Sequence, residues 1–537
     1  MKKEYIVLLV GMVFLHVACD DVLDKEPVAD LSLGNFFKSE SDFELAANNL
    51  YVAIDSLHSS SINGIDDTRS VDYFESNDIS SGNHQVPNTD NLWISAYTTI
   101  RGANFLLEAS ETSEVEAGVR LRYEAEARFF RGMSHFALVQ RFGDVPLVLQ
   151  TLDFSEVTPP RDPRATVINS VVEDFRFAAD NLPSKSELAG DELGRITRGM
   201  ALGYLSRAAL YEGTHAKFHS SGSDANALLT IARDAALAVI NEGEYDLFAG
   251  NIDEIFFEAN ENNVEVMLSV VYEELLTTFS PRGRGHVIDA IQDPTKYLAD
   301  AFLCTDGLPI DQSPLFQGYT SLTSEFENRD PRMEAVLWKP GTPFEGGQPM
   351  LPELIRSRTG YWPRKPGDPI ATEVVFVFTD AIIMRYAEIL LNYAEAVYEL
   401  NESITDAELN VSINKLRDRA GMINLTNAHV TGNNLNMREE IRRERRVELA
   451  GEGFRYNDII RWRIAETELP RVVLGTRFQA EEYPGLIVGT DVVLDTDGFI
   501  IAEPEANRSF DPSRHYLFPL PLREVNLNSD LTQNPNW

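Results

Sequence analysis

Cysteine is scarce in this sequence, with only Cys19 and Cys304 among 537 residues. A scaffold of several disulfides is therefore excluded, and no intramolecular disulfide can form if Cys19 is covalently modified. Cys304 directly follows the apolar residues 301–303, a setting in which a free cysteine usually packs as a small hydrophobic side chain. We therefore expect Cys304 to be buried; a catalytic thiol is the alternative.

Basic residues are in the minority. Lysine and arginine number 47 against 84 aspartates and glutamates, and the formal net charge is −37. A chain this acidic repels nucleic-acid phosphates and anionic lipid headgroups. The charge therefore argues against these partners and is compatible with a neutral ligand, a cationic ligand or a protein partner. Acidity also serves solubility without any ligand, which is the simpler interpretation.

The sequence also lacks the common short motifs of catalysis. It contains no G-x-S-x-G, no phosphate-binding G-x-x-x-x-G-K-[ST], no G-x-G-x-x-G and no H-E-x-x-H. His215 and His219 could share one helical face, but no third metal ligand is apparent beside them. We therefore predict no metal, no cofactor and no enzymatic activity. The many carboxylates leave a glycosidase-like pair open as an alternative.

Long apolar runs are confined to the N-terminus. Lys2 and Lys3 precede the nearly continuous apolar segment 5–17, which ends in Val17, Ala18 and Cys19. This pattern is typical of a secretory signal, and small residues before a cysteine resemble the lipobox of bacterial lipoproteins. We predict a signal peptide over 1–18, lipidation of Cys19 and an extended leader over 19–41. An ordinary cleaved signal is the alternative.

Apolar residues recur every three or four positions in most of the remaining chain. The pattern predicts a mainly α protein with about four tetratricopeptide-like helical hairpins, in a single domain over 42–537. The helical units are expected at about 42–57, 92–142, 198–241 and 380–462. An irregular, loop-rich module with a few short β-strands is expected at about 264–375, with a strand over 264–271. Separately, residues 495–498 predict a β-hairpin turn between apolar runs.

Five arginines lie between Arg438 and Arg446, but glutamates are interleaved with them. The segment is therefore nearly neutral, which disfavours nucleic acid. We predict that these side chains form ion pairs that brace one helix against its neighbours.

The segment Met437–Trp462 also carries a family likeness. Its pattern E-L-x-x-E-G-x-R-x-x-D-x-x-R-W resembles the C-terminal hallmark of the SusD/RagB family of surface glycan-binding lipoproteins. The matching residues are Glu448, Leu449, Glu452, Gly453, Arg455, Asp458, Arg461 and Trp462. The likeness extends over the whole chain, most clearly at 384–396, 414–421, 517–528 and 531–535.

The resemblance implies a helical protein that captures an oligosaccharide or polysaccharide without chemistry. It also implies a SusC-like TonB-dependent transporter as partner, and a lipid anchor in the outer membrane, facing outward. Asp20 and Asp21 resemble the export signal of such lipoproteins. A peptide ligand, as on the RagB side of the family, is one alternative, and a surface glycosidase is a second.

A glycan site needs aromatic faces beside polar groups on exposed loops, because sugar rings stack through C–H groups and pair through hydroxyls. Two loop regions meet this requirement. The first, 73–91, offers Tyr73, Phe74, Asp78, Asn83 and His84. The second, within 264–375, offers Phe279, Arg282, Arg284, Trp338 and Trp362. Core packing is an equally good interpretation of Trp338 and Trp362.

Overall fold

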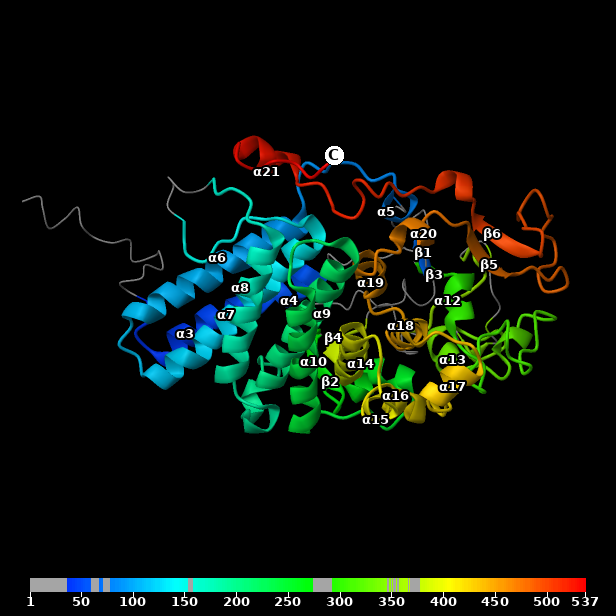
Figure 1. Cartoon of the computed structure of the whole chain (residues 1–537), viewed down its shortest axis with the longest axis horizontal. Coiled ribbons are helices and arrows are strands. Elements are labelled where there is room, and N and C mark those ends of the chain that lie inside the picture. The colour runs from blue at the N-terminus through cyan, green and yellow to red at the C-terminus, as the bar shows by residue number, and fades with distance from the viewer. Residues whose placement is uncertain are drawn as a thin grey trace, which may run out of the picture.

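The structure is a computed structural model (Figure 1). It describes residues 36–58, 67–70, 78–152, 158–273, 292–344, 347–348, 350, 354, 357–365, 367 and 377–537. The predicted signal peptide, the lipidated Cys19 and most of the predicted leader lie outside these residues.

Long helices stack side by side across one half of the molecule (Figure 1). They follow the order of the sequence: α6 packs on α7, α7 on α8, α8 on α9, α9 on α10 and α10 on α14. Their bounds are α6 Asn91–Thr112, α7 Ala117–Phe142, α8 Arg164–Asn181, α9 Arg198–His219, α10 Ala225–Glu242 and α14 Tyr386–Asn401. The predicted mainly helical, hairpin-based fold is confirmed.

The first predicted helical unit, 42–57, is divided into two helices. α3 covers Glu40–Leu50 and α4 covers Val52–His58, with a turn at Tyr51. The Tyr51 hydroxyl donates a hydrogen bond to Glu126 at 3.0 Å and accepts one from the Ile196 N–H at 2.9 Å. The division therefore coincides with a side chain that ties this segment to α7 and to the start of α9.

The helix predicted from residue 380 begins later than expected. Residues Ala381–Arg385 form strand β4, which pairs antiparallel with β2 (Val266–Val270). The β-branched Ile382 and Ile383 favour an extended backbone, and pairing with β2 satisfies its hydrogen bonds. The prediction of helix over these five residues was wrong, whereas the strand predicted over 264–271 is confirmed.

The other half of the molecule consists of short elements around irregular chain (Figure 1). Strand β1 (Thr68–Ser70) pairs with β3 (Gln292–Pro294), and β5 (Val473–Arg477) pairs with β6 (Phe499–Glu503), both antiparallel. The short α-helices are α5 Asp78–Ser81, α12 Lys296–Ala301, α13 Arg332–Val336, α15 Asp406–Asn410, α16 Ile413–Ala420, α17 Asn427–Gly432, α18 Met437–Glu448, α19 Arg455–Arg461, α20 Ala465–Glu468 and α21 Leu522–Leu527. The 3₁₀ helices are η1 Lys185–Glu187, η2 Gly190–Glu192, η3 Ile252–Phe256, η4 Glu258–Asn260, η6 Ser324–Phe326 and η9 Glu505–Asn507.

The predicted turn over 495–498 is present. The Asp495 N–H donates to the Phe499 carbonyl at 2.9 Å, and Leu494 lies opposite Ile500 in an antiparallel bridge. Gly498 has a φ of 85°, a conformation that a residue with a side chain rarely adopts.

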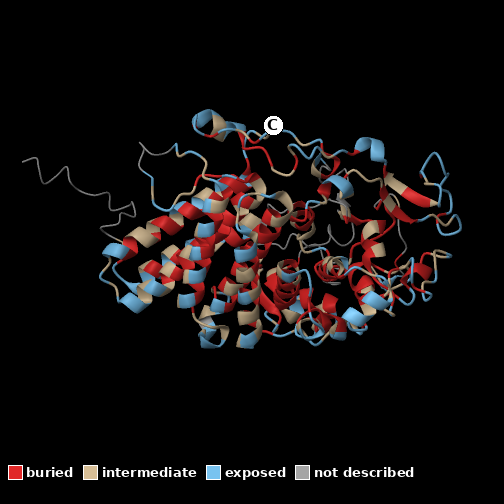
Figure 2. Cartoon of the chain, in the orientation of Figure 1, coloured by how far each residue is buried: buried red, intermediate tan, exposed pale blue. Residues whose placement is uncertain are grey.

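Buried residues line the contacts between the stacked helices, and exposed residues lie on their outer faces (Figure 2). Phe129, Phe130 and Phe175 are completely inaccessible at the centre of this core. Cys304 is also fully buried, as predicted. Among the described residues, no helix combines the length and apolar character needed to cross a bilayer.

Candidate functional site

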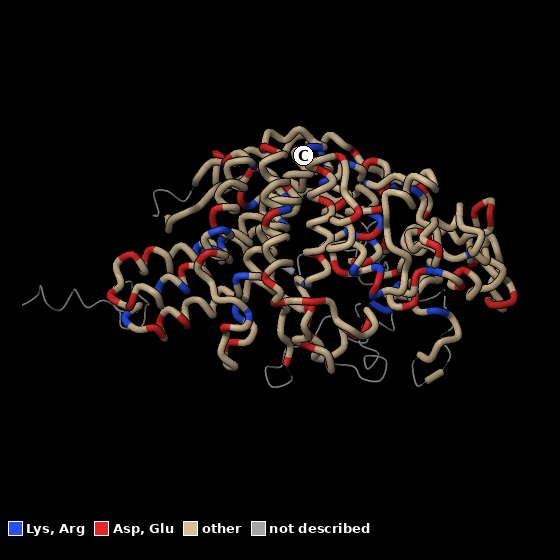
Figure 3. Tube along the Cα trace, turned by 60° about the horizontal axis from the view of Figure 1, so that its bottom comes forward, with Lys and Arg blue, Asp and Glu red and all other residues tan. Residues whose placement is uncertain are grey.

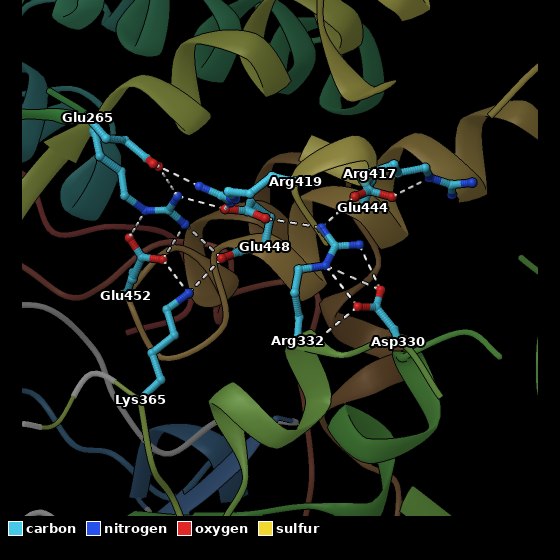
Figure 4. Close-up of polar contacts among 10 residues, drawn as sticks. Glu265, Asp330, Arg332, Lys365, Arg417, Arg419, Glu444, Glu448 and Glu452 are labelled. Atoms are coloured by element: carbon cyan, nitrogen blue, oxygen red, sulfur yellow. Dashed lines mark hydrogen bonds and ion pairs between the residues drawn. The ribbon is translucent and has the colours of Figure 1, made fainter. Parts of the chain in front are cut away.

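The hallmark helix α18 lies at the centre of a buried network of ion pairs (Figure 4). Arg385 Nη1 contacts Glu265 and Glu448, each at 2.7 Å, and Arg332 Nη1 contacts Glu444 at 2.6 Å. The network balances five cationic side chains with five carboxylates. Its members are Arg332, Lys365, Arg385, Arg417, Arg419, Glu265, Asp330, Glu444, Glu448 and Glu452.

Glu448, at the centre of this network, stays ionised although water is excluded. Burial alone would raise the pKa of Glu448, but Arg419, Arg385 and Arg332 lower it well below the usual value. Burial opposes ionisation at Glu395 in the same way, yet Arg461 lowers its pKa to about 2. Because these groups bind one another, the hallmark is structural, and the predicted bracing of the arginine-rich helix is confirmed.

The same helix also positions the β1–β3 ladder. Asp67, the residue before β1, accepts a hydrogen bond from Arg446 Nε of α18 at 2.8 Å, and its carbonyl accepts the Thr295 N–H at 2.9 Å. Ser70 lies opposite Gln292 in the ladder. The ladder therefore places β1, just before the first predicted region, beside β3 of the second region, and α18 holds this pairing in place.

Asp78, Asn83 and His84 lie together, as the first predicted region requires. The Asp78 carbonyl, at the start of α5, accepts the N–H groups of Asn83 and His84 at 2.7 and 3.1 Å. Asp78 and Asn83 are exposed and His84 is half-buried. A short helix therefore replaces part of the predicted loop and presents these residues on one surface.

Asp78 and His84 border an open groove of about 830 Å³ between α5, the start of α6 and the C-terminal segment. Its lining combines carboxylate, amide, guanidinium and aromatic groups. The lining residues are Ser56, Asp78, Ile79, His84, Gln85, Pro87, Thr89, Asp90, Asn91, Leu92, Ser95, Arg141 and Phe518. Such a surface can pair with hydroxyl groups and stack against a ring.

Aromatic rings from the C-terminus pack against His84. The ring centroids of His515, Phe518 and Trp537 lie 4.9, 5.3 and 4.9 Å from that of His84. Burial and the neighbouring His515 lower the pKa of His84 to about 4, so its imidazole is neutral at pH 7.

Five groove residues lie outside both predicted regions: Ser56, Leu92, Ser95, Arg141 and Phe518. The Arg141 guanidinium lies 4.6 Å from the Phe518 ring centroid and forms an ion pair with Asp90 at 3.0 Å. Arg141 lies in α7, Phe518 lies in the C-terminal segment, and Asp90 directly precedes α6. The family likeness at 517–528 drew attention to the C-terminal segment. That likeness gave no reason to place the segment beside α5.

Trp338 and Trp362 lie in a small core and not on a ligand surface. Their exposed fractions are 6% and 2%, and they cluster with Met350 and Val377, with Phe344 packed against the group. The Trp338 N–H of the backbone donates to the Trp362 carbonyl at 2.9 Å. Buried indoles cannot stack on a sugar, so the core interpretation describes both residues in this structure.

The remaining candidates of both regions lie outside the described residues. They are Tyr73, Phe74, Phe279, Arg282 and Arg284.

His215 and His219 stack on one face of α9 with ring centroids 4.1 Å apart and an interplanar angle of 5°. His219 Nε2 contacts the Ile460 carbonyl at 2.7 Å, which ties α9 to α19. In the part of the chain that the structure describes, no group of three His, Cys, Asp or Glu side chains is arranged to hold a metal. The pair therefore acts in packing.

Two sequence models of known families match the chain. The model described as the SusD family matches residues 281–537, and a SusD-like model described as "starch-binding associating with outer membrane" matches residues 23–210. SusD-like protein P25 of Formosa agariphila is 23% identical over 99% of both chains. A SusD-like protein of Bacteroides ovatus is also 23% identical, over 86% of this chain and 83% of that protein.

Solved structures show the same architecture. The crystal structure of a SusD-like carbohydrate binding protein from Bacteroides fragilis is 26% identical, covers 93% of this chain and all of that chain, and has a TM-score of 0.77. A second SusD-like protein from the same species is 23% identical, covers 96% of this chain and all of that chain, and shares the fold with a TM-score of 0.73. With its hallmark helix, its stacked helical hairpins and these full-length relatives, the chain belongs to the SusD/RagB family.

Proposed function

We propose that this chain is a non-catalytic, cell-surface glycan-binding lipoprotein. It captures oligosaccharides and delivers them to a SusC-like TonB-dependent transporter in the outer membrane. Membership of the SusD/RagB family supports this proposal, as does the 26% identity to a solved SusD-like carbohydrate binding protein. The description of the N-terminal family model, which associates it with the outer membrane, supports the location.

The observation that carries the proposal is the open groove beside α5. Asp78 and Gln85 are exposed at this groove, where their side chains can pair with hydroxyl groups. The half-buried His84 supplies an aromatic ring next to them, and the buried Phe518 packs against that ring. A volume of about 830 Å³ lies within the range typical of small-ligand sites. This combination suits a neutral, hydroxyl-rich ligand, and the net charge of −37 disfavours an anionic one.

The β1–β3 ladder extends the proposed site. Ser70 and Gln292 are paired, and the chain continues from them into the segments that carry Tyr73, Phe74, Phe279, Arg282 and Arg284. We propose that these residues add ligand contacts to those of the groove. The ladder supports this because it places Ser70 opposite Gln292, so the two segments connect to neighbouring positions of the chain.

Lipidation of Cys19 completes the proposed arrangement. Two or more acyl chains attach a protein stably, because each buried CH₂ contributes about 0.8 kcal/mol. Replacing Cys19 with alanine should release the protein from the membrane fraction. Retention of the Cys19→Ala variant in that fraction would contradict the lipid anchor.

A glycan array tests the proposed function directly. Protein lacking residues 1–19 should bind at least one oligosaccharide or polysaccharide and leave it intact. Release of shorter sugars during the incubation would favour a surface glycosidase. Calorimetry with peptides in place of oligosaccharides separates the remaining alternative, since binding of peptides alone would favour a peptide-uptake function.

A further inference from the structure

The chain between β5 and β6 carries apolar side chains into solvent. Leu486, Ile487, Val488 and Val493 are 37%, 62%, 52% and 55% exposed, and together they define the apolar tip. The segment projects at the end of the molecule that lies opposite α3 (Figure 1). Clustered exposed aliphatic side chains are unfavourable in water and commonly mark interaction surfaces.

The apolar tip is held in a defined shape by the rest of its loop. The Ile487 N–H donates to the Asp491 carboxylate, and the Gly489 N–H donates to the Val492 carbonyl, both at 2.8 Å. Val492 itself is buried at 6% exposure. These contacts fix the backbone while the apolar side chains point outward, so the tip is preorganised for a partner.

The foot of the loop is anchored to the irregular module. The Tyr483 ring stacks on Phe478 with centroids 5.5 Å apart and an interplanar angle of 12°. Gln479 Nε2 donates to the Tyr319 carbonyl at 2.7 Å. The tip is therefore a rigid extension of this half of the molecule.

The segment that carries the apolar tip contains charged residues of one sign only, while Arg477 and Arg508 lie at its two ends and Arg508 pairs with Glu503. Residues 478–507 include no lysine or arginine, and acidic residues mark this end of the chain trace (Figure 3). The carboxylates are Glu481, Glu482, Asp491, Asp495, Asp497, Glu503 and Glu505. Anionic lipid surfaces attract basic segments, so the rim disfavours insertion into a membrane. It also disfavours a second copy of this chain, whose net charge is −37.

We infer that the apolar tip docks into an apolar pocket rimmed by lysine and arginine on a protein partner. The partner is the TonB-dependent transporter, so the inference rests on the proposed function and specifies one contact surface for it. Aliphatic side chains at the centre of an interface exclude water, while complementary charges at its rim direct the encounter and fix the register.

Retention of the transporter by the full-length chain tests this surface. The chain is co-expressed with a SusC-like transporter, and the complex is purified from outer membranes. The Ile487→Asp and Val488→Asp double variant should retain at least tenfold less transporter than the wild type. Reversing the rim with Glu481→Lys and Glu482→Lys should also reduce retention, and this loss should grow as salt is lowered.

Leu193→Asp is the matched control, because Leu193 is 69% exposed at the end of η2 and should retain the transporter normally. Unchanged thermal unfolding of all variants confirms that they fold. Equal retention by wild type and the double variant would overturn the docking surface and leave the proposed function standing. Failure of the wild type itself to retain any transporter would overturn both.

Discussion

Asp67 and Arg446 form a partly buried ion pair although they lie 379 positions apart in the sequence. Asp67 stands at the start of β1, and Arg446 lies in the hallmark helix α18. The pair therefore links the hallmark helix α18, which is part of the structural core, directly to the β1–β3 ladder. The two proposed ligand segments continue from this ladder.

Replacing Arg446 with methionine should weaken both the fold and ligand binding. Methionine keeps much of the side-chain volume but removes the hydrogen bonds to Asp67, so the start of β1 loses its anchor. We expect a loss of about 1–3 kcal/mol in the free energy of unfolding, and a loss of at least about tenfold in oligosaccharide affinity, which corresponds to 1.4 kcal/mol.

Calorimetry of binding and denaturant unfolding measure the two effects. Arg443→Met is the control on the same helix, since Arg443 contacts Glu440 at 3.4 Å and is partly exposed. A variant Arg446→Met that binds oligosaccharide as tightly as wild type would show that the ladder does not position the ligand segments.

Glu448 should be essential for stability. It is fully buried and contacts Arg385, Arg419 and Arg332. Glu448→Ala removes the one carboxylate that all three guanidinium groups share and leaves the network with an excess of buried positive charge. Breaking a buried ion pair typically costs about 3–5 kcal/mol. Glu439→Ala, at a side chain 59% exposed on the same helix, should change the free energy of unfolding by less than about 0.5 kcal/mol. Urea unfolding of both variants checks this contrast.

The groove residues Asp78 and Gln85 should contribute to ligand binding without supporting the fold. Both are exposed, so Asp78→Ala and Gln85→Ala remove hydrogen-bonding groups at little structural cost. Each change should weaken oligosaccharide binding by about 0.5–1.5 kcal/mol. Glu114→Ala is the control, because Glu114 is exposed beyond the other end of the 22-residue helix α6, about 30 Å away. If both groove variants bind oligosaccharide with full affinity, the groove is not the ligand site.

Glu325 should make stability depend on pH in the neutral range. Burial raises its pKa to about 7, and its carboxyl accepts a hydrogen bond from the Tyr361 hydroxyl at 2.8 Å. The folded state binds the proton more tightly than the unfolded state, whose pKa is about 4.3. Its contribution to stability is therefore complete below about pH 4 and is lost as the pH rises to about 7.

Glu325→Gln removes this titration and keeps a group that can accept the Tyr361 hydrogen bond. The variant should therefore gain stability relative to wild type as the pH rises from 5 to 8. The pH dependence of thermal unfolding, compared between the two proteins, measures the effect. A constant difference over that range would show that Glu325 does not titrate as described.

His84 should give stability the opposite pH dependence, in a more acidic range. Its folded-state pKa of about 4 lies below the usual value of 6.5, so the unfolded state binds the proton more tightly between these values. Stability should fall as the pH drops from about 6.5 to 4. His84→Gln should be less sensitive than wild type in this window, which paired unfolding curves would reveal. Parallel curves would contradict the shift.

The sequence predicted those features that depend on local periodicity. The stacked helices, the buried Cys304 and the ion-pairing role of the residues between Arg438 and Arg446 all follow from the spacing of side chains along one segment. The strand at Ile382 was missed because its extended conformation depends on pairing with β2, more than a hundred residues earlier. Local periodicity carries no information about such a partner.

The site was harder to predict for the same physical reason. Trp338 and Trp362 both pack against Phe344 within an irregular module, and nothing in their neighbouring residues distinguishes a buried indole from an exposed one. Phe518 reaches the groove only because the C-terminal segment returns to α5. Contacts between distant segments decided these positions, whereas Asp78, Asn83 and His84 were predicted together because they lie in one short segment.

The order of helix contacts has a consequence for how the chain folds. Because α6 to α10 each pack on the next helix in sequence, this half can assemble from local contacts while the rest of the chain is still emerging. The buried charge network has the opposite character, since its members span residues 265 to 452. Folding should therefore proceed in two stages. The helical stack forms early, and the charge network forms only after the hallmark helix α18 has been synthesised.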